Sequence, residues 1–308
     1  MSTVDSVLLI AFGGPEKPED IRPFLQIVTA GRPIPPERIE EVAHHYELIG
    51  GRSPLNELTF KQAKGLRRAL KREGLSVPVY VGMRNWHPFL HETLAAMREV
   101  GLRRAFAIIL SAFQTEASWQ RYMVDVVIAF RKVGAGVPEV RYAPPWFDHP
   151  RFIEAVAERV RAALGHVPPE RRAETRLIFT AHSVPTAMAD ASPYVEQFWA
   201  ASHAVAGRLD LRRWSVAYQS RSGAPGDPWL EPDIADMLRD VAKVGARDVL
   251  VAPIGFVCDH VEVLYDLDVE ARRLATALGI RLHRAGAAND HPAFIEMLAD
   301  LVRGGLGA

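Results

Sequence analysis

Short apolar runs, rich in β-branched residues, alternate with longer stretches of helical periodicity along the whole chain. This alternation is typical of βαβ units, in which successive strands join one sheet in parallel. The eight runs fall into two groups of about four, which predicts an α/β protein with two parallel sheets flanked by helices. The expected strands are Val7–Ala11, Val77–Gly82, Ala105–Leu110, Val140–Ala143, Arg176–Ala181, Trp214–Tyr218, Val249–Pro253 and Ile280–His283.

The two halves of the chain also resemble each other locally. Residues Leu9–Pro15 and Ile178–Pro185 both read as an apolar strand that ends in a turn before a helix. Two similar halves place a cleft between them, and open parallel sheets bind ligands beyond the carboxyl ends of their strands. The expected helices are Thr59–Glu73, Phe89–Val100, Ala117–Val133, Arg151–Leu164, Tyr194–Leu209, Pro232–Val244, Val261–Leu278 and Pro292–Val302.

Length and charge narrow the class of protein. A chain of 308 residues corresponds to about two domains, and the expected boundary lies near Ala143-Pro144-Pro145. Lys plus Arg number 37 and Asp plus Glu number 37, so no basic excess exists and nucleic acid is not an expected partner. The single cysteine, Cys258, excludes an internal disulfide and a Cys-ligated cluster within one chain.

The sequence contains no signal for membrane insertion. No apolar run reaches the ~18 residues that span a bilayer. The first residues, Met1–Ser6, include Asp5 and lack the basic region of a signal peptide. We therefore expect a cytoplasmic protein without a transmembrane segment, and peripheral membrane contact stays open.

Two strand ends carry polar or glycine-rich turns. Phe12-Gly13-Gly14-Pro15 lacks the G-x-G-x-x-G spacing, so it reads as a tight βα turn and not as a dinucleotide site. His182 follows an apolar strand and emerges where the core meets the expected cleft. Its imidazole is either a satisfied structural group or one that exchanges protons or binds a transition metal.

A row of carboxylates in the third strand-end segment points to a cation. Glu262, Asp266 and Glu270 are spaced four apart, so in a helix they share one face, with Asp268 nearby. Side chains four residues apart shift gradually around the axis of an α-helix. They stay better aligned in a wider π-type turn, a feature that is common at functional sites. Most of the residues between these carboxylates are apolar, which predicts that much of this segment is buried. The alternatives are a path for a divalent cation and a solvated acidic face.

Several segments together resemble the ferrochelatases, the enzymes that insert ferrous iron into a porphyrin. The two most specific signatures read Thr180-Ala-His-Ser-Val-Pro185 and Asp259-His-Val-Glu-Val-Leu-Tyr-Asp-Leu-Asp268. The matches come in the family's order and cover nearly the whole chain. They are Tyr46–Pro54, Tyr80–Pro88, Ala181–Pro185, Tyr218–Ser222 with Pro228–Leu230, and Pro253–Asp268.

The resemblance implies a fold and a set of partners. The expected fold is two Rossmann-like domains, residues 1–143 and 144–289, each a four-stranded parallel sheet flanked by helices, with the active-site cleft between them. The final helix, about residues 290–308, packs back on the first domain. Porphyrin and ferrous iron are the expected substrates of a monomer that holds no permanently bound cofactor. The cysteines that bind a [2Fe–2S] cluster in some relatives are missing.

Residue roles follow from the resemblance by position. His182 and Glu262 are the expected catalytic pair on opposite sides of the porphyrin, with His182 acting either as proton acceptor or as first iron ligand. The expected metal-binding residues are His182, Glu262, Asp266, Asp268 and Glu270. The expected substrate-binding residues are Phe12, Tyr46, Ser53, Arg84, Trp229 and His260.

Residues 29–45 bear on which porphyrin the protein would bind. Residues Gly31 to His45 form a short, charged stretch, which favours coproporphyrin III over protoporphyrin IX. Thr29 and Ala30 stand where some relatives have arginines, so Arg32 and Arg84 are the candidate replacements for binding propionates. The rival functions are a chelatase for another tetrapyrrole and metal, and a non-catalytic haem or metal carrier.

Overall fold

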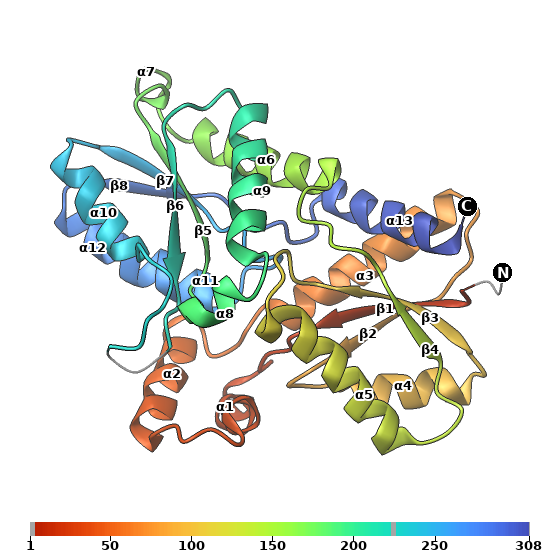
Figure 1. Cartoon of the computed structure of the whole chain (residues 1–308). Helices are drawn as coiled ribbons and strands as arrows, with labels where there is room; N and C mark the ends of the chain where they lie inside the picture. Colours follow the sequence, from red (N-terminus) through yellow and green to blue (C-terminus); the bar gives the residue numbers. More distant parts are fainter. Residues whose placement is uncertain (1–3, 223–225, 308) are drawn as a thin grey trace. The chain divides into compact units, whose positions relative to one another are not determined.

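The computed structural model describes residues 4–222 and 226–307, which divide into two compact units (Figure 1). Residues Ala112–Glu116 belong to the second unit, although the prediction counted them with the first domain. The backbone N–H of Gln114 donates to Oε1 of Gln197 at 2.8 Å, which ties this short segment to the second unit. Unit 1 comprises Met1–Ser111, Ala117–Pro145 and Asp290–Ala308, and unit 2 comprises Ala112–Glu116 and Trp146–Asn289.

The sheet of unit 1 is four-stranded and parallel, in the order β2-β1-β3-β4. Every residue of β1 is buried, because the sheet is covered on both faces. The chain adds β2 on one side of β1 and β3 on the other, so the topological switch point lies between β1 and β3. The strands are β1 (Ser6–Ala11), β2 (Val79–Met83), β3 (Arg104–Ile109) and β4 (Glu139–Tyr142).

The helices of unit 1 include the last helix of the chain. Helix α13 packs on α3 and on β3 at two glycines. A Cβ on Gly65 would lie 3.0 Å from Ile295, and a Cβ on Gly305 would overlap the ring of Phe106. The helices are η1 (Pro18–Asp20, 3-10), α1 (Ile21–Thr29), α2 (Pro36–Leu48), α3 (Leu55–Arg72), α4 (Leu90–Glu99), the π-helical η2 (Glu116–Gln120), α5 (Arg121–Val133) and α13 (Pro292–Leu306).

Unit 2 repeats the sheet order of unit 1 as β6-β5-β7-β8, again all parallel. β1 and β5 hold the same place in their sheets, which explains the local similarity of their sequences. The eight predicted strands are all confirmed, with ends within two residues of those expected. The strands of unit 2 are β5 (Arg176–His182), β6 (Trp214–Gln219), β7 (Asp248–Ala252) and β8 (Arg281–Arg284).

The helices of unit 2 bury their apolar stripes against this sheet. Leu238 of α10 and Leu267 of the π turn, for example, pack with Ile178 and Val251 of the strands in one fully buried cluster. The helices are α6 (Pro150–Gly165), α7 (Pro169–Arg172), α8 (Thr186–Asp190), α9 (Tyr194–Arg208), α10 (Ile234–Lys243), α11 (Val261–Tyr265), the π-helical η3 (Asp266–Ala271) and α12 (Arg272–Ala277).

The last three of these elements form one continuous helix. It runs from Val261 to Ala277 with a π-helical turn, Asp266–Ala271, between two α-helical ends. This confirms both the expected helix and the wider turn expected from the carboxylate spacing. Because the wider turn holds more residues, side chains four apart stay on one side of the helix.

The charged stretch Gly31 to His45 is mostly helical, because residues 36–45 belong to helix α2, Pro36–Leu48. Only Ala43 and Tyr46 of this helix are buried, and seven of its thirteen residues are Glu, Arg or His.

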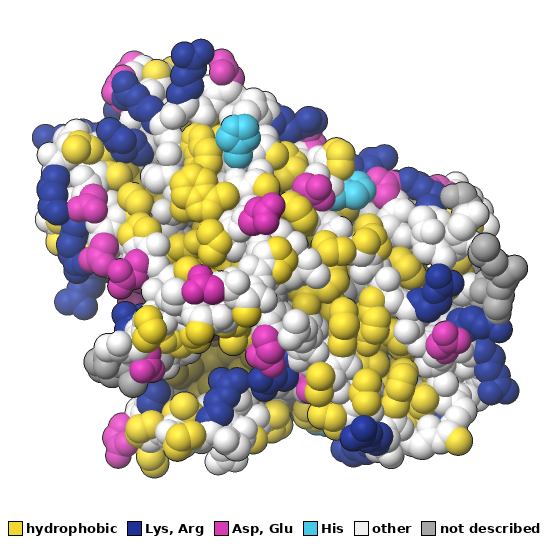
Figure 2. All heavy atoms as spheres, in the orientation of Figure 1, with side chains coloured by type: hydrophobic (Ala, Val, Ile, Leu, Met, Phe, Trp, Pro, Cys, Tyr) yellow, Lys and Arg dark blue, Asp and Glu magenta, His cyan; other side chains and the backbone are white. Residues whose placement is uncertain are grey.

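Exposed apolar side chains also gather on α5, as Figure 2 shows. Val124, Val127 and Ile128 form a solvent-facing stripe at helical spacing. No helix in residues 4–222 or 226–307 is both long enough and apolar enough to cross a bilayer.

Candidate active site

The candidate active site of unit 2 forms at the carboxyl edge of its sheet. His182 is the last residue of β5, and Gln219 is the last residue of the neighbouring β6. The chain leaves β7, on the other side of β5, and enters helix α11 at Val261. The switch point of this sheet lies between β5 and β7, which is where ligands bind in open parallel sheets.

The side chains of His182 and Glu262 face each other directly, and their placement on opposite sides of a porphyrin stays a prediction. Nδ1 of His182 donates to the carbonyl of Ser183, which leaves Nε2 directed at the Glu262 carboxylate, 3.4 Å from Oε1. The hydroxyl of Tyr194 donates to the His182 carbonyl at 2.8 Å and fixes the end of the strand. The two side chains stay 31% and 40% exposed, so a substrate can reach them.

The pairing strongly changes the proton affinity of both groups. Burial lowers the pKa of His182, but the Glu262 carboxylate outweighs burial and raises that pKa to about 9. Burial raises the pKa of Glu262, but the imidazolium of His182 outweighs it and lowers that pKa to about 2. The pair is therefore an imidazolium and a carboxylate at neutral pH.

His260 supports Glu262 from the start of the helix. As the N-terminal cap of α11, its Nδ1 accepts the backbone N–H of Glu262 at 3.2 Å. Its ring packs edge-on against Phe256, with 4.9 Å between ring centroids. Burial lowers the pKa of His260, which keeps the ring neutral and Nδ1 free to accept.

Asp266 is the second carboxylate of the row. The hydroxyl of Ser220 donates to Oδ2 of Asp266, and Ser220 holds a left-handed backbone with φ of 63° to reach it. Burial raises the pKa of Asp266 to about 7, with further contributions from Glu262 and Glu270. This carboxyl can therefore gain and lose a proton near neutral pH.

Asp268 is held outside the row by arginine. Both of its carboxylate oxygens accept Nε–H of Arg284, at 2.8 and 2.9 Å, and Arg272 lies 3.4 Å away. Arg284 also donates to Asp259 at 2.9 Å, and Asp259 accepts from Asn289 at 2.7 Å. The structure thus places Asp268 in a partly buried ion-pair network and not beside His182.

Glu270 lies at the exposed end of the row. Together, Glu262, Asp266 and Glu270 lead from the partly buried His182 to solvent. Within residues 4–222 and 226–307, no three His, Cys, Asp or Glu side chains are grouped closely enough to hold a metal ion. The metal-ligand roles stay a prediction.

Trp229 lies beside the His182 loop. Pro185 and Trp229 form an isolated antiparallel bridge. The N–H of Leu230 donates to the Val184 carbonyl at 3.0 Å, and the hydroxyl of Ser183 donates to the Leu230 carbonyl at 2.9 Å. Two motifs distant in sequence thus meet at one strand end, with Trp229 partly exposed.

In unit 1, the carboxyl ends of β1 and β2 bring Phe12 and Arg84 together. The guanidinium of Arg84 lies 5.7 Å from the Phe12 ring centroid and 4.4 Å from that of Tyr122. Its Nε bonds Asp125 at 2.5 Å, and the Arg84 side chain is only 11% exposed. Phe12, by contrast, is 38% exposed and offers a flat apolar face.

Tyr46 and Ser53 are both buried within unit 1. The Tyr46 ring packs edge-on against Phe24 at 6.2 Å. The Ser53 N–H donates to the Pro15 carbonyl at 2.7 Å, and its Oγ accepts the Leu55 N–H at 3.3 Å. Their predicted contacts with a macrocycle stay a prediction.

Several residues that help to build these sites were not among the predicted site residues. Gln219 donates to the Glu262 carbonyl at 2.7 Å and positions the first turn of α11. Ser220 binds Asp266, and Arg284 removes Asp268 from the row. Gln219 and Ser220 directly follow a predicted strand, a position that could have singled them out.

The fold is that of chelatases. SirB from Bacillus subtilis, solved with Fe3+, superposes with a TM-score of 0.62 at 12% identity, covering 98% of this chain and 96% of SirB. DR2241 from Deinococcus radiodurans, described as structurally similar to chelatases, gives 0.55 at 17% identity, covering 99% of this chain and 56% of DR2241.

Sequence similarity is more specific. The family model named Ferrochelatase matches residues 4–306. The coproporphyrin III ferrochelatase of Nocardia farcinica is 43% identical, covering 97% of this chain and 88% of that protein. The ferrochelatase of Rhodopirellula baltica is 41% identical, covering 98% and 86%. The chain belongs to the ferrochelatase family.

Proposed function

We propose that this protein inserts ferrous iron into coproporphyrin III in the cytoplasm, as a monomer and without an iron–sulfur cluster. The observation that carries the proposal is the His182–Glu262 pair, 3.4 Å apart, at the start of a row of carboxylates on a π-helical turn. Curated relatives from Nocardia farcinica and Mycolicibacterium smegmatis, at 43% and 42% identity, carry the name coproporphyrin III ferrochelatase.

The chemistry of metal insertion fits this arrangement. Two pyrrole N–H protons must leave the ring, and a base within hydrogen-bond reach must accept them. At neutral pH the His182–Glu262 pair already holds one proton, so His182 can take a pyrrole proton only after passing that proton on. Because the pKa of Asp266 is about 7, this carboxyl can carry the proton onward to the exposed Glu270.

Binding of the porphyrin needs both a flat apolar surface and cations. In unit 1, the rings of Phe12 and Trp86 pack edge-on against Phe24, at 6.3 and 6.1 Å, and supply the apolar surface. Arg84 is committed to Asp125. The Arg32 side chain is exposed and makes no hydrogen bond or ion pair within residues 4–222 and 226–307. We therefore assign a propionate to Arg32 in preference to Arg84.

The test is metallation of purified protein under anaerobic conditions. Ferrous iron is added with coproporphyrin III or with protoporphyrin IX in the same detergent, and kcat/KM is measured from the change in the porphyrin absorption bands. We expect turnover with both and a higher kcat/KM for coproporphyrin III. Absence of turnover refutes the enzyme assignment, and preference for protoporphyrin IX refutes only the substrate.

A histidine variant tests the site itself. His182→Ala should abolish iron insertion and leave porphyrin binding within about tenfold, because loss of a positioned base alone costs 10²–10⁴ in rate. His166→Ala is the matched control, since His166 is exposed beyond the end of α6. Retention of most turnover by His182→Ala contradicts the assignment.

A further inference from the structure

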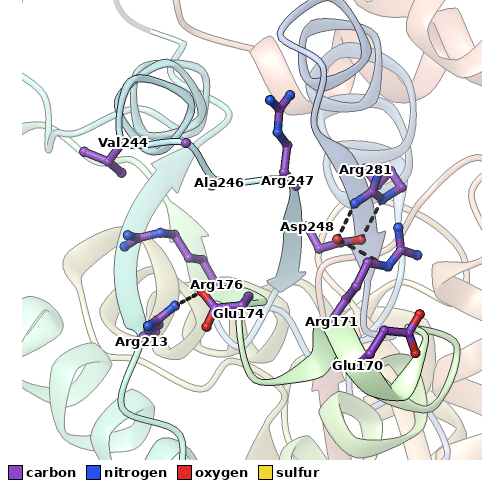
Figure 3. Close-up of a pocket in the computed structure, with 11 residues that line it drawn as sticks. Glu170, Arg171, Glu174, Arg176, Arg213, Val244, Ala246, Arg247, Asp248 and Arg281 are labelled. Atoms are coloured by element: carbon purple, nitrogen blue, oxygen red, sulfur yellow. Dashed lines mark hydrogen bonds and ion pairs between the residues drawn. The ribbon is translucent and has the colours of Figure 1, made fainter.

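The amino-terminal edge of the unit 2 sheet carries a cluster of arginines. Arg176 and Arg281 are the first residues of β5 and β8, and Arg213 and Arg247 directly precede β6 and β7. Because the four strands are parallel, their first residues meet at one edge. Together with Arg171 of the short α7, these side chains surround a hollow of about 510 Å³ (Figure 3).

Part of this charge is already neutralised. Asp248, which is buried, accepts from Nε and Nη2 of Arg281 at 3.0 and 2.6 Å and lies 3.0 Å from Nε2 of His283. Glu174 pairs with Arg213. These contacts hold two of the five arginines in place.

The side chains of the remaining three arginines make no hydrogen bond within the described residues. In the parts of the chain that the structure describes, Arg176 and Arg247 make no side-chain hydrogen bond or ion pair. Nε of Arg171 is buried without a hydrogen-bond partner and lies 3.7 Å from Asp248. With Glu170, the hollow contains five arginines and three carboxylates, an excess of two positive charges. Figure 2 shows Lys and Arg side chains gathered around α7.

The lining of the hollow defines the ligand. It contains no aromatic residue, and the apolar side chains of its lining are Val244 and Ala246, so it offers little apolar surface for burying a nucleobase or a porphyrin. A guanidinium group is planar and can donate two parallel N–H hydrogen bonds to two oxygens of one phosphate, like the two prongs of a fork. Several such forks around one hollow favour a compact anion with more than one phosphate.

We propose that this hollow is a binding site for a small polyphosphate anion of the pyrophosphate class, held by Arg171, Arg176 and Arg247. It is separate from the site at His182, which lies at the other end of β5, about 20 Å away at ~3.3 Å per residue. The proposal does not depend on the chelatase activity. An anion there links the beginnings of all four strands of the sheet.

Calorimetric titration with inorganic pyrophosphate tests the site, at about 0.15 M ionic strength and without divalent metal. We expect one saturable site per chain with a Kd below about 1 mM. Orthophosphate at equal ionic strength should bind at least about tenfold more weakly, since it engages fewer forks. Absence of a saturable isotherm, or equal affinity for both anions, overturns the proposal.

Two double variants locate the site. Arg176→Gln with Arg247→Gln should weaken pyrophosphate binding at least about tenfold, because charge-assisted hydrogen bonds to the anion are lost. Arg161→Gln with Arg273→Gln removes the same charge from exposed positions of unit 2 outside the hollow and should leave the Kd within about twofold. Equal effects of both pairs would refute the location, and thermal unfolding without ligand verifies that each variant is folded.

Discussion

Replacing Glu262 by glutamine should lower the pKa of His182 from about 9 to 6.5 or less. Burial opposes the charge of this imidazole, and the Glu262 carboxylate, 3.4 Å from Nε2, outweighs burial. Glutamine keeps the shape of the side chain and removes its charge, so burial then dominates. Glutamine cannot accept or relay a proton, so we also expect turnover to fall at least ~10²-fold, the lower range for a positioned acid–base group.

The size of the effect follows from the structure. A fall of at least about 2.5 in pKa corresponds to about 3 kcal/mol of differential interaction. Glu262 is 40% exposed, so water screens the pair, and we expect about 1–2 kcal/mol in the free energy of unfolding. The pKa of His182 is raised on folding, so its contribution to stability is complete below about pH 6.5 and is lost as the pH rises through about 9.

The assay is an NMR titration of the histidine ring signals from pH 5 to 10, with His182 assigned through its alanine variant. Glu270→Gln is the matched control, because it makes the same chemical change at the exposed end of the same row. We expect that control to leave the midpoint of His182 near that of the wild type. A His182 midpoint that is the same with and without the Glu262 carboxylate would refute the reasoning.

Three further predictions concern the same unit. Asp266→Asn should remove a step near pH 7 from the pH–rate profile and reduce turnover less than the Glu262 variant; an unchanged profile contradicts the relay. Arg284→Leu should destabilise unit 2 by about 3 kcal/mol in urea unfolding, because the partly buried Asp259 then loses its cation and Asp268 keeps only Arg272, 3.4 Å away. Gly255→Ala should cost about 1–3 kcal/mol, since its Cβ would lie 2.6 Å from the β5 backbone. Gly207→Ala, which meets nothing within 4 Å, should not destabilise the protein.

Sequence periodicity was sufficient for the strands and for the unusual helix turn. Strands buried on both faces appear as continuous apolar runs, and this pattern does not depend on distant contacts. The π turn was predictable because carboxylates four apart, at Glu262, Asp266 and Glu270, are separated mostly by apolar residues, several of which pack into the core. Each of these two sequence patterns lies within a single strand or helix.

Interactions between elements could not be predicted in this way. Asp268 and Arg284 pair across a helix and a strand, and the register that joins them is set by packing of the sheet. Ser220 reaches Asp266 only through a left-handed backbone, which no propensity of serine indicates. Helix α2 lacks a clear apolar stripe, because only two of its residues are buried.

The position of α13 determines the order in which the protein can fold during synthesis. Unit 2 ends at Asn289, so nearly all of its chain is contiguous and its sheet can close as soon as that residue leaves the ribosome. Unit 1 needs α13 to cover Gly65 and Phe106, although its four strands were made long before. The first domain to be translated is thus the last to be completed. Until α13 is made, the apolar site at which it packs on unit 1 stays uncovered. In a chain that stops before Pro292, this site is never covered.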